Sequence, residues 1–242
     1  MKRILGVLFF VGVMVMPTVA AAAEQIGVYV APKFVYGLTQ MDSAKQHWTG
    51  AAGASGSERI GNETDSAFGG SIAIGYDFDK KFGVPVRAEL EYAAFSEVEA
   101  KRNYTDNGEH ITMKQNFNLQ TLFVNAYWDI NTGTQFTPYI GAGLGMGFIN
   151  TKGKESGYGI ANPAANSWNY STGSKNVTNF AWNVGAGLGY DLTENWTLDA
   201  GYRFVGLGSV KTKTYDNGQD TVYGKTSNLY QHQFAVGVRY TF

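Results

Sequence analysis

The chain has 242 residues, no cysteine and a formal net charge of −1. The absence of Cys excludes disulfides, thiolate metal sites and cysteine nucleophiles, and the near-neutral charge gives no sign of a nucleic-acid or acidic partner. Gly is abundant, at 31 residues, aromatic residues make up 14% of the chain and charged residues only 16%. This mixture favours strands and turns, and it suits a membrane-embedded chain whose apolar residues stand at alternate positions.

The N-terminus has the three parts of a secretory signal peptide. Two basic residues precede an apolar run over residues 4–16, and small residues follow as far as Ala23. This pattern predicts cleavage after Ala23, so that residues 1–23 form the signal peptide and residues 24–242 form one mature domain. The apolar run is shorter than the roughly 20 residues of a membrane-spanning helix, which argues against an uncleaved anchor.

Large and small residues then alternate with a period of two in eight segments, each long enough to cross a bilayer as a tilted strand. In the fourth segment two phases are open, and we prefer Leu122 and Val124 outward with Phe123 and Asn125 inward. The alternation predicts strands, in chain order, at 27–38, 67–78 and 84–95, a fourth that ends at Ile130, then 140–148, 180–190 and 198–204, and a last one that ends at Phe242.

One face of these segments carries large apolar and aromatic residues, and the other carries mostly Gly and Ala with a few charges. An apolar exterior facing lipid and a crowded interior of small residues explain both faces, and backbone groups in lipid require a closed sheet. We therefore predict an all-β fold, an eight-stranded antiparallel transmembrane β-barrel with up-and-down meander topology.

The connections alternate between long and short, as in outer-membrane barrels with long external loops and tight periplasmic turns. This asymmetry predicts four external loops, three periplasmic turns and both mature termini in the periplasm. The long links cover residues 39–66, 96 to about 115, 149–178 and 206 to about 228, and the short ones cover 79–83, 131–135 and 193–195.

Turn residues refine this prediction. The sequences at 106–108 and 216–218 are both Asp-Asn-Gly, which predicts two hairpins that extend beyond the membrane. The other two long links are rich in Gly, Ala, Ser and Asn, which predicts irregular, mobile loops. Pro32 lacks an N–H within the first strand and predicts a bulge or a local bend there.

Four short motifs lie in the predicted strands: residues 87–92 (RAELEY), 125–129 (NAYWD), 138–145 (PYIGAGLG) and 201–204 (GYRF). Together they resemble the OmpA-like and opacity-type eight-stranded surface antigens of Gram-negative bacteria. Val238, Tyr240 and Phe242 resemble the aromatic C-terminal signal that the barrel assembly machinery reads. The resemblance implies an outer-membrane location, but such barrels serve as anchors, adhesins, small channels and antigens.

Charged residues on the inward faces form the candidate site. The resemblance to OmpA implies an interior network in which Lys33, Glu89 and Arg239 match by strand and facing, whereas Gly201 replaces a family Glu, so that the network must be rearranged. Lys33 and Arg239 lie on strands that become neighbours when the barrel closes, and we expect Glu89 and Glu91 to neutralise them. The full interior set is Lys33, Arg87, Glu89, Glu91, Asp199, Arg203 and Arg239.

These charges can line an ion path or neutralise one another in a packed lumen. Packing is favoured, because side chains can fill an eight-stranded interior.

Other motifs carry no chemistry. The glycines at 141–147 lack dinucleotide spacing, residues 216–220 do not fit a calcium loop, and His47 and His110 show no metal-ligand spacing. We predict no metal and no cofactor. Lipid A deacylase barrels have a His and a Ser two residues apart, but here the second residue after His232 is Phe234, which leaves a lipid-modifying enzyme as a remote alternative.

The leading hypothesis is a non-enzymatic surface barrel that displays its loops as an adhesin, a surface antigen or an envelope-stabilising element, and the alternative is a narrow porin-like diffusion channel. The expected partners are outer-membrane lipid and lipopolysaccharide, the barrel assembly machinery and a host or surface ligand. Aromatic residues in the polar loops are the candidate ligand contacts: Trp48, Tyr158, Trp168 and Tyr170.

Overall fold

The computed structural model describes residues 26–49, 53–106, 108–161, 163, 167–216 and 221–242. The predicted signal peptide and the turn at 217–218 lie outside these residues. No helix in the described part of the chain is long and apolar enough to span a membrane. The elements are β1 (Val28–Thr49), β2 (Ser55–Asp77), α1 (Asp79–Phe82), β3 (Val86–Phe95), β4 (Val98–Asp106), β5 (Glu109–Asp129), β6 (Phe136–Gly159), β7 (Ser167–Asp191), β8 (Trp196–Gly206), β9 (Val210–Lys211), β10 (Tyr215–Asp216), β11 (Thr221–Thr226) and β12 (Asn228–Thr241).

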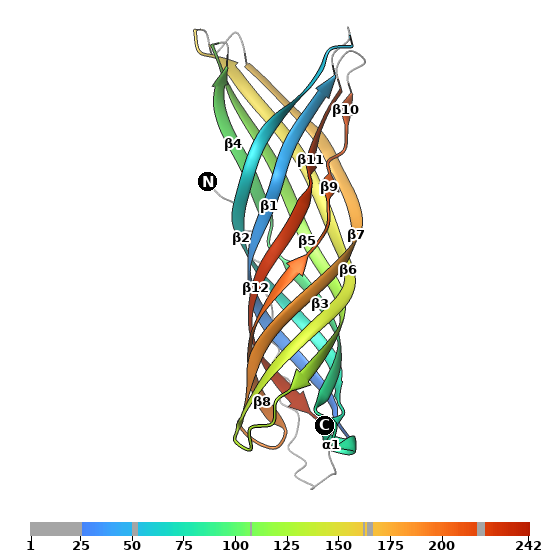
Figure 1. Cartoon of the computed structure of the whole chain (residues 1–242). Coiled ribbons are helices and arrows are strands. Elements are labelled where there is room, and N and C mark those ends of the chain that lie inside the picture. Colours follow the sequence, from blue (N-terminus) through green and yellow to red (C-terminus); the bar gives the residue numbers. More distant parts are fainter. Residues whose placement is uncertain (1–25, 50–52, 107, 162, 164–166, 217–220) are drawn as a thin grey trace.

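The strands form one closed antiparallel sheet. β1 pairs with β2 on one side and with β12 on the other, so the sheet has no free edge along the barrel wall. β3 and β4 both pair with β5, and β11 and β12 both pair with β1, so each couple is one interrupted strand. β8, β9 and β10 likewise form one interrupted strand. The wall therefore has the predicted eight strands, and Figure 1 shows how they follow one another around the barrel.

The pleat separates a lipid-facing exterior from the lumen. In β5 the side chain of Val124 is 62% exposed, whereas Phe123 is fully buried, so the preferred phase of the fourth predicted strand is confirmed. Exposed apolar residues continue around the wall, for example Ile74, Leu144 and Val236. A barrel that exposes such residues over its whole girth is stable only in lipid.

Aromatic side chains mark the two edges of this apolar band. Near the short turns Trp196 packs on Tyr240 at a ring-centroid distance of 4.7 Å. Towards the long hairpins Tyr36 packs on Phe68 at 5.2 Å, and the Phe204 ring lies 5.3 Å from that of Tyr230. Such aromatic girdles lie at membrane–water interfaces.

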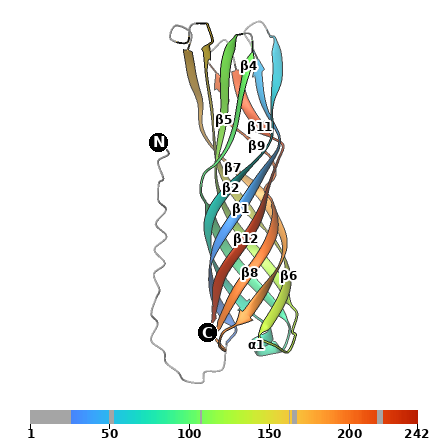
Figure 2. The same ribbon diagram turned by 90° about the vertical axis from the view of Figure 1, so that its left-hand side faces the viewer.

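The prediction of two irregular loops at 39–66 and 149–178 is wrong. β1 continues to Thr49 before β2 begins at Ser55, and β6 continues to Gly159 before β7 begins at Ser167. Their ladders run almost to the tips, so backbone pairing rather than apolar side chains extends these polar strands. The long connections are therefore tall β-hairpins at the end of the barrel opposite α1 and the C-terminus (Figure 2).

The structure also describes the turn predicted at 106–108 and the three short connections. The hairpin at 106–108 is confirmed, since Asp106 pairs with Glu109 and Gly108 has a left-handed φ of 78°. The short connections at 79–83, 131–135 and 193–195 are also confirmed, the first as the single turn α1.

Of the bulge or local bend predicted at Pro32, the bulge is wrong. The β1–β12 register is unchanged between Val30 and Lys33, and Pro32 pairs with Ile72 of β2. The proline interrupts the ladder towards β12 without adding a residue. The irregularity of β1 lies further on, where the register shifts after Met41 and Ser43 has a positive φ of 53°.

Glycines on the inward faces make room for aromatic rings inside the barrel. A Cβ at Gly75 would overlap the ring of Tyr29, and a Cβ at Gly187 would overlap the ring of Tyr139. The same relation holds between Gly141 and Tyr127. The alternation of Gly with large residues thus serves both faces, since the large residues meet lipid and the glycines accommodate the lumen side chains.

This arrangement predicts unequal costs for two equivalent substitutions on the inward face of β7. In Gly187→Ala the new methyl group meets the Tyr139 ring and lies 2.7 Å from the backbone oxygen of Ala200, whereas in Gly189→Ala its nearest neighbour is a Thr197 methyl group at 3.2 Å. We expect Gly187→Ala to lower the free energy of unfolding by about 1–3 kcal/mol, and Gly189→Ala to change it much less. Urea unfolding in lipid vesicles, followed by the gel mobility of unheated samples, measures both; equal losses would contradict the packing described.

Candidate functional site

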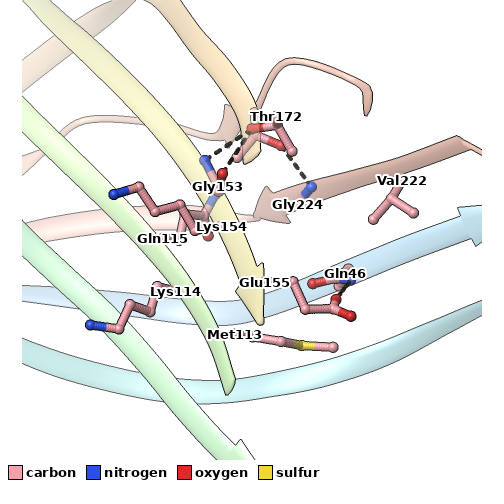
Figure 3. A pocket seen from close by; sticks show the side chains of 11 residues that line it. Gln46, Met113, Lys114, Gln115, Gly153, Lys154, Glu155, Thr172, Val222 and Gly224 are labelled. Carbon is pink, nitrogen blue, oxygen red and sulfur yellow. Dashed lines mark hydrogen bonds between the residues drawn. The ribbon is translucent and has the colours of Figure 1, made fainter. Parts of the chain in front are cut away.

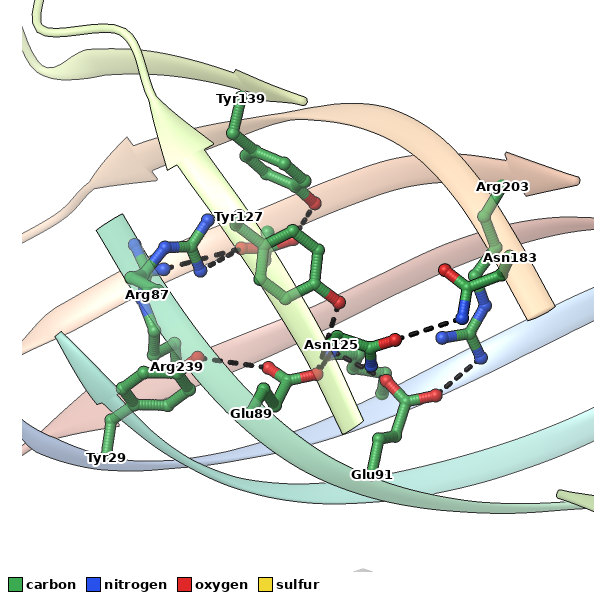
Figure 4. A network of polar contacts seen from close by, with 12 residues as sticks. Tyr29, Arg87, Glu89, Glu91, Asn125, Tyr127, Tyr139, Asn183, Arg203 and Arg239 are labelled. Atoms are coloured by element: carbon green, nitrogen blue, oxygen red, sulfur yellow. Dashed lines mark hydrogen bonds and ion pairs between the residues drawn. The ribbon is translucent and has the colours of Figure 1, made fainter. Parts of the chain in front are cut away.

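The inward-facing charges gather in two groups, one above the other along the barrel axis. The central charge group consists of Lys33, Glu89, Glu91 and Arg203. Lys33 Nζ lies 2.8 Å from a carboxylate oxygen of each glutamate, and Arg203 Nη2 lies 2.5 Å from the second oxygen of Glu91. Glu91 therefore bridges a cation of β1 and a cation of β8 across the lumen. Figure 4 shows its contact with Arg203.

The turn-side charge group lies closer to the short turns and consists of Arg87, Asp129, Asp199 and Arg239. Arg87 donates two hydrogen bonds to Asp129, of 2.6 and 2.8 Å, in the bidentate geometry that suits guanidinium and carboxylate. Asp199 Oδ2 lies 4.0 Å from both Arg87 and Arg239. Sequence reasoning missed Asp129, although it continues the inward alternation of Phe123, Asn125 and Tyr127.

The expected neutralisation of Arg239 by Glu89 and Glu91 is wrong. In the β1–β12 register Lys33 faces Gly237, and Arg239 lies two residues nearer the turns, opposite Thr197 of β8. This offset places Arg239 beside Asp199 and over the ring of Tyr29, at 5.6 Å from its centroid. A sequence pattern assigns these residues to a face, but the register decides which of them meet.

Uncharged side chains complete both groups, and sequence reasoning did not single them out. Tyr29 and Tyr127 donate hydrogen bonds of 3.2 and 3.3 Å to Glu89, and Tyr139 donates to Asp199 at 2.5 Å. The ring of each of these tyrosines lies over an inward-facing glycine of the neighbouring strand. A tyrosine paired with a glycine was therefore the sequence signal that could have identified them.

Burial makes these contacts energetically important. Glu89 and Glu91 are 3% and 1% exposed, so each has exchanged its hydration for protein partners. Such an exchange is tolerable only when the remaining lone pairs are satisfied, and the tyrosines and cations supply those bonds. One donor in the turn-side group, Nη1 of Arg239, is buried without a hydrogen bond.

A small cavity of about 40 Å³ adjoins the central charge group and is bordered by Lys33, Glu91, Tyr127 and Arg203. Contacts from β1 to β3, from β3 to β8 and from β6 to β8 cross the lumen beside it. The lumen thus combines paired charges with a space that holds no more than a few water molecules.

A second, smaller cavity, of about 20 Å³, lies between the hairpins above the apolar band (Figure 3). Gln46 donates a 2.7 Å hydrogen bond to Glu155, and Trp168 Nε1 lies 3.4 Å from the other oxygen of that carboxylate. Gly153 N–H donates to Thr172 Oγ1 at 2.9 Å. These bonds tie the hairpin of β1 to the hairpin of β6 and β7.

The four predicted loop contacts do not form one cluster. Trp48 is 44% exposed on the first hairpin, and Tyr158 is 41% exposed with its ring 5.2 Å from that of His110. Trp168 is partly buried beside Glu155. The side chain of Tyr170 lies outside the described part of the structure.

The C-terminal residues complete the wall. Phe242 donates a backbone hydrogen bond of 2.9 Å to Val28, and its ring packs edge-on against Tyr240 at 5.0 Å. Val238 pairs with Leu198 of β8. The last residues therefore join β12 to the start of β1, where the barrel closes.

The histidines lie in three separate places. His47 stacks on Tyr223, His110 lies beside Tyr158, and His232 Nδ1 lies 2.8 Å from the Tyr202 hydroxyl in the upper aromatic girdle. Within the residues that the structure describes, no group of three or more His, Asp or Glu side chains is placed to hold a metal ion.

A closed antiparallel barrel with an apolar, aromatic-edged exterior defines an outer-membrane barrel protein. The comparisons agree: residues 5–242 match the family "Outer membrane protein beta-barrel domain", and the chain belongs to this family. It is 31% identical to Outer membrane protein PagN of Salmonella typhimurium, over 96% of this chain and 99% of that protein. It is therefore a surface barrel of the outer membrane.

Two further comparisons are more distant. Opacity protein V28 of Neisseria gonorrhoeae is 28% identical over 71% of this chain and 76% of its own length. The crystal structure of OprG from Pseudomonas aeruginosa covers 91% of this chain and 98% of that one, with 15% identity and a TM-score of 0.49.

The central charge group gives a prediction with an internal control. Glu91→Gln leaves Arg203 and Lys33 short of a buried counter-charge, and we expect a loss of about 3–5 kcal/mol in the free energy of unfolding. Glu58→Gln removes the exposed ion pair with Arg102, whose atoms lie 3.3 Å apart, and we expect a change of less than about 1 kcal/mol. Urea titration in vesicles compares the two; a Glu91→Gln protein as stable as Glu58→Gln would refute a structural role for the group.

Proposed function

We propose that this barrel is a non-enzymatic display protein, which presents its four tall hairpins at the cell surface and keeps its lumen closed to ions. The observation that carries the proposal is the pair of charge groups that cross the lumen. Each buried cation there faces an acid within 4.0 Å, so ions entering the lumen would have to break these pairs.

The hairpins supply the displayed surface. Their strands continue beyond the upper girdle, and the bond from Gln46 of β1 to Glu155 of β6 holds two hairpins from opposite sides of the barrel together. An ordered surface loses little conformational entropy when it binds a partner. Exposed Trp48 and Tyr158 are the aromatic groups best placed for such contact, which supports a role as an adhesin or antigen.

The surroundings of His232 support the absence of catalysis. A lipid-modifying serine enzyme needs a nucleophile within hydrogen-bond reach of its base. Here the group beside His232 is the Tyr202 hydroxyl, at 2.8 Å, and Phe234 occupies the position two residues on.

The proposal also covers how the chain is exported and which way the barrel faces in the outer membrane. A signal peptide over residues 1–23 would direct the chain across the inner membrane, and the barrel assembly machinery would read the strand that ends at Phe242. Both mature termini would then lie in the periplasm, on the side of the short turns, and the tall hairpins would face outwards. Outer-membrane lipid and lipopolysaccharide would surround the wall.

A comparison of adhesion and conductance on the same folded protein tests the proposed function. We expect binding of protein-bearing vesicles to host cells or another surface, together with little steady conductance in planar bilayers. In the double variant Glu89→Ala/Glu91→Ala we expect an ion leak, because Lys33 and Arg203 lose their counter-charges. Glu58→Gln is the matched control and should stay closed. A large, stable conductance from the unaltered protein would favour a narrow diffusion channel instead.

Truncation tests the assembly step. Removal of Phe242 deletes the terminal ring and its backbone bond to Val28, so we expect normal export to the periplasm but impaired insertion into the outer membrane. Fractionation of cells, with heat-modifiable gel mobility as the measure of folded barrel, separates the two stages. Val84→Ala, which shortens an exposed apolar side chain near the same end, should insert normally. Wild-type outer-membrane levels of the truncated protein would exclude this role for Phe242.

A further inference from the structure

Above the apolar band the ring of paired strands divides into two sheets. The ladder between β7 and β8 ends at Trp182 and Gly206, and the ladder between β2 and β3 ends at Gly69 and Phe95. Among the described residues, β9 and β10 then pair only with β11, and β4 pairs only with β5. The wall above the upper girdle therefore has two seams that no backbone ladder crosses.

The two sheets contain different hairpins. The first outer sheet consists of the upper parts of β1 and β2 with β9, β10 and β11, and the second outer sheet consists of β4 with the upper parts of β5, β6 and β7. Figure 1 shows their tips diverging, the first sheet at the upper right and the second at the upper left. Side chains bridge the seam between β2 and β4, where Asp65 accepts a 2.8 Å bond from the N–H of Glu99.

The first outer sheet joins the barrel wall through three interrupted strands. In β1 the register shifts beside Ser43, which has a positive φ of 53°. Ser227 separates β11 from β12, and Gly208, with a φ of 74°, lies between β8 and β9. The N–H of Ser227 donates to the backbone oxygen of Asp42, and the N–H of Leu229 donates to that of Gly208. The three interruptions therefore lie side by side, at one level.

The second outer sheet continues the wall without such a line. The ladder between β5 and β6 runs from Asp129 and Tyr139, near the short turns, to Glu109 and Gly159 at the tips, with no register shift. β7 is also unbroken. Strands bend where extra residues interrupt a ladder, and hinge motions are absorbed by a few residues at the ends of elements. The first sheet is thus free to rotate against a fixed second sheet.

Few contacts hold the inner faces of the two sheets together. Gln46 of the first sheet donates its 2.7 Å bond to Glu155 of the second, and Ala44 packs on Met113. Gln115, which lines the small cavity between the sheets, is 2% exposed and its Nε2 has no hydrogen-bond partner. A buried donor without a partner costs free energy. The closed arrangement is therefore only weakly favoured over one in which the sheets separate.

We propose that the first outer sheet is a lid, hinged along Ser43, Ser227 and Gly208, that swings away from the second outer sheet. The structure shows the closed lid, and opening would uncover Glu155 and the ring of Trp168. Buried apolar side chains fill the barrel below the lid, so the movement leaves the charge groups of the lumen in place. This inference gives the displayed surface two states, and it depends neither on adhesion nor on a closed lumen.

Distances between spin labels in lipid vesicles, measured by double electron–electron resonance, test the proposal. The chain has no cysteine, so Thr221→Cys with Ser156→Cys labels one strand of each sheet. Thr221 lies six residues beyond Ser227, roughly 20 Å from the hinge, so a rotation of about 15–30° moves its label by roughly 5–10 Å. We expect a main population at the closed distance and a second one longer by this amount.

Pairs within one sheet are the controls for local flexibility. Ser57→Cys with Thr221→Cys reports on the first sheet, and Lys101→Cys with Ser156→Cys reports on the second. Each should give a single narrow distance, because the ladder within each sheet is continuous. Distributions as broad as that of the pair between the sheets would mean that the hairpins are individually flexible, and would overturn the lid.

Three substitutions shift the two populations in different ways. Glu155→Ala removes the bond that closes the lid, and should raise the ratio of open to closed molecules roughly tenfold. Gln115→Leu removes the unpaired donor and should lower this ratio. Asn176→Ala removes a 2.6 Å bond to Asn150 within the second sheet and should leave it unchanged. Heat-modifiable mobility verifies that each variant is folded. A single closed distance in both the unaltered barrel and Glu155→Ala would overturn the proposal.

Discussion

The structure depends on one constraint, that no backbone N–H or C=O may remain unpaired in hydrocarbon. Along the wall this constraint is met when β12 pairs with β1, with Phe242 bonded to Val28. Closure on eight strands fixes a narrow lumen, and the narrow lumen determines which side chains the inward face can carry. Tyrosine rings fit because glycines lie opposite them, and the charges must therefore find partners within a few ångströms.

The lumen shows how a polar interior is made compatible with this confinement. Glu91 bridges Lys33 and Arg203, and Arg87 holds Asp129 with two bonds. Each pair joins different strands, so the groups brace the barrel from inside. The proposed closure of the lumen to ions would follow from the same contacts.

Outside the membrane the ladder of backbone hydrogen bonds between the strands continues. It lengthens polar strands into hairpins without needing an apolar core, because each additional residue pair contributes its own hydrogen bonds. The wall therefore presents two zones: an apolar band for acyl chains, and polar hairpins with exposed Trp48 and Tyr158. A surface protein needs both, since it must be anchored and accessible.

The sequence by itself determined the fold class, the number of strands, the outward phase of residues such as Val124 and the inward facing of the lumen charges. These properties follow from the period-two alternation, which is local. It also indicated the hairpin at 106–108, because Asp-Asn-Gly favours one backbone geometry. Composition alone gave a wrong prediction for the links at 39–66 and 149–178. Their polar residues predicted irregular loops, but these segments are paired strands.

Only the tertiary structure decided which inward residues meet. Whether Arg239 reaches Glu89 or Asp199 depends on a two-residue offset between β12 and β1, and Asp129 becomes a partner because β3 and β5 lie side by side. The pairing of Lys45 with Lys225 is also invisible in the sequence, since the two residues are 180 positions apart and become opposed only through the register. Because β1 and β12 are far apart in the chain, no turn fixes their register, and it is decided only when the ring closes.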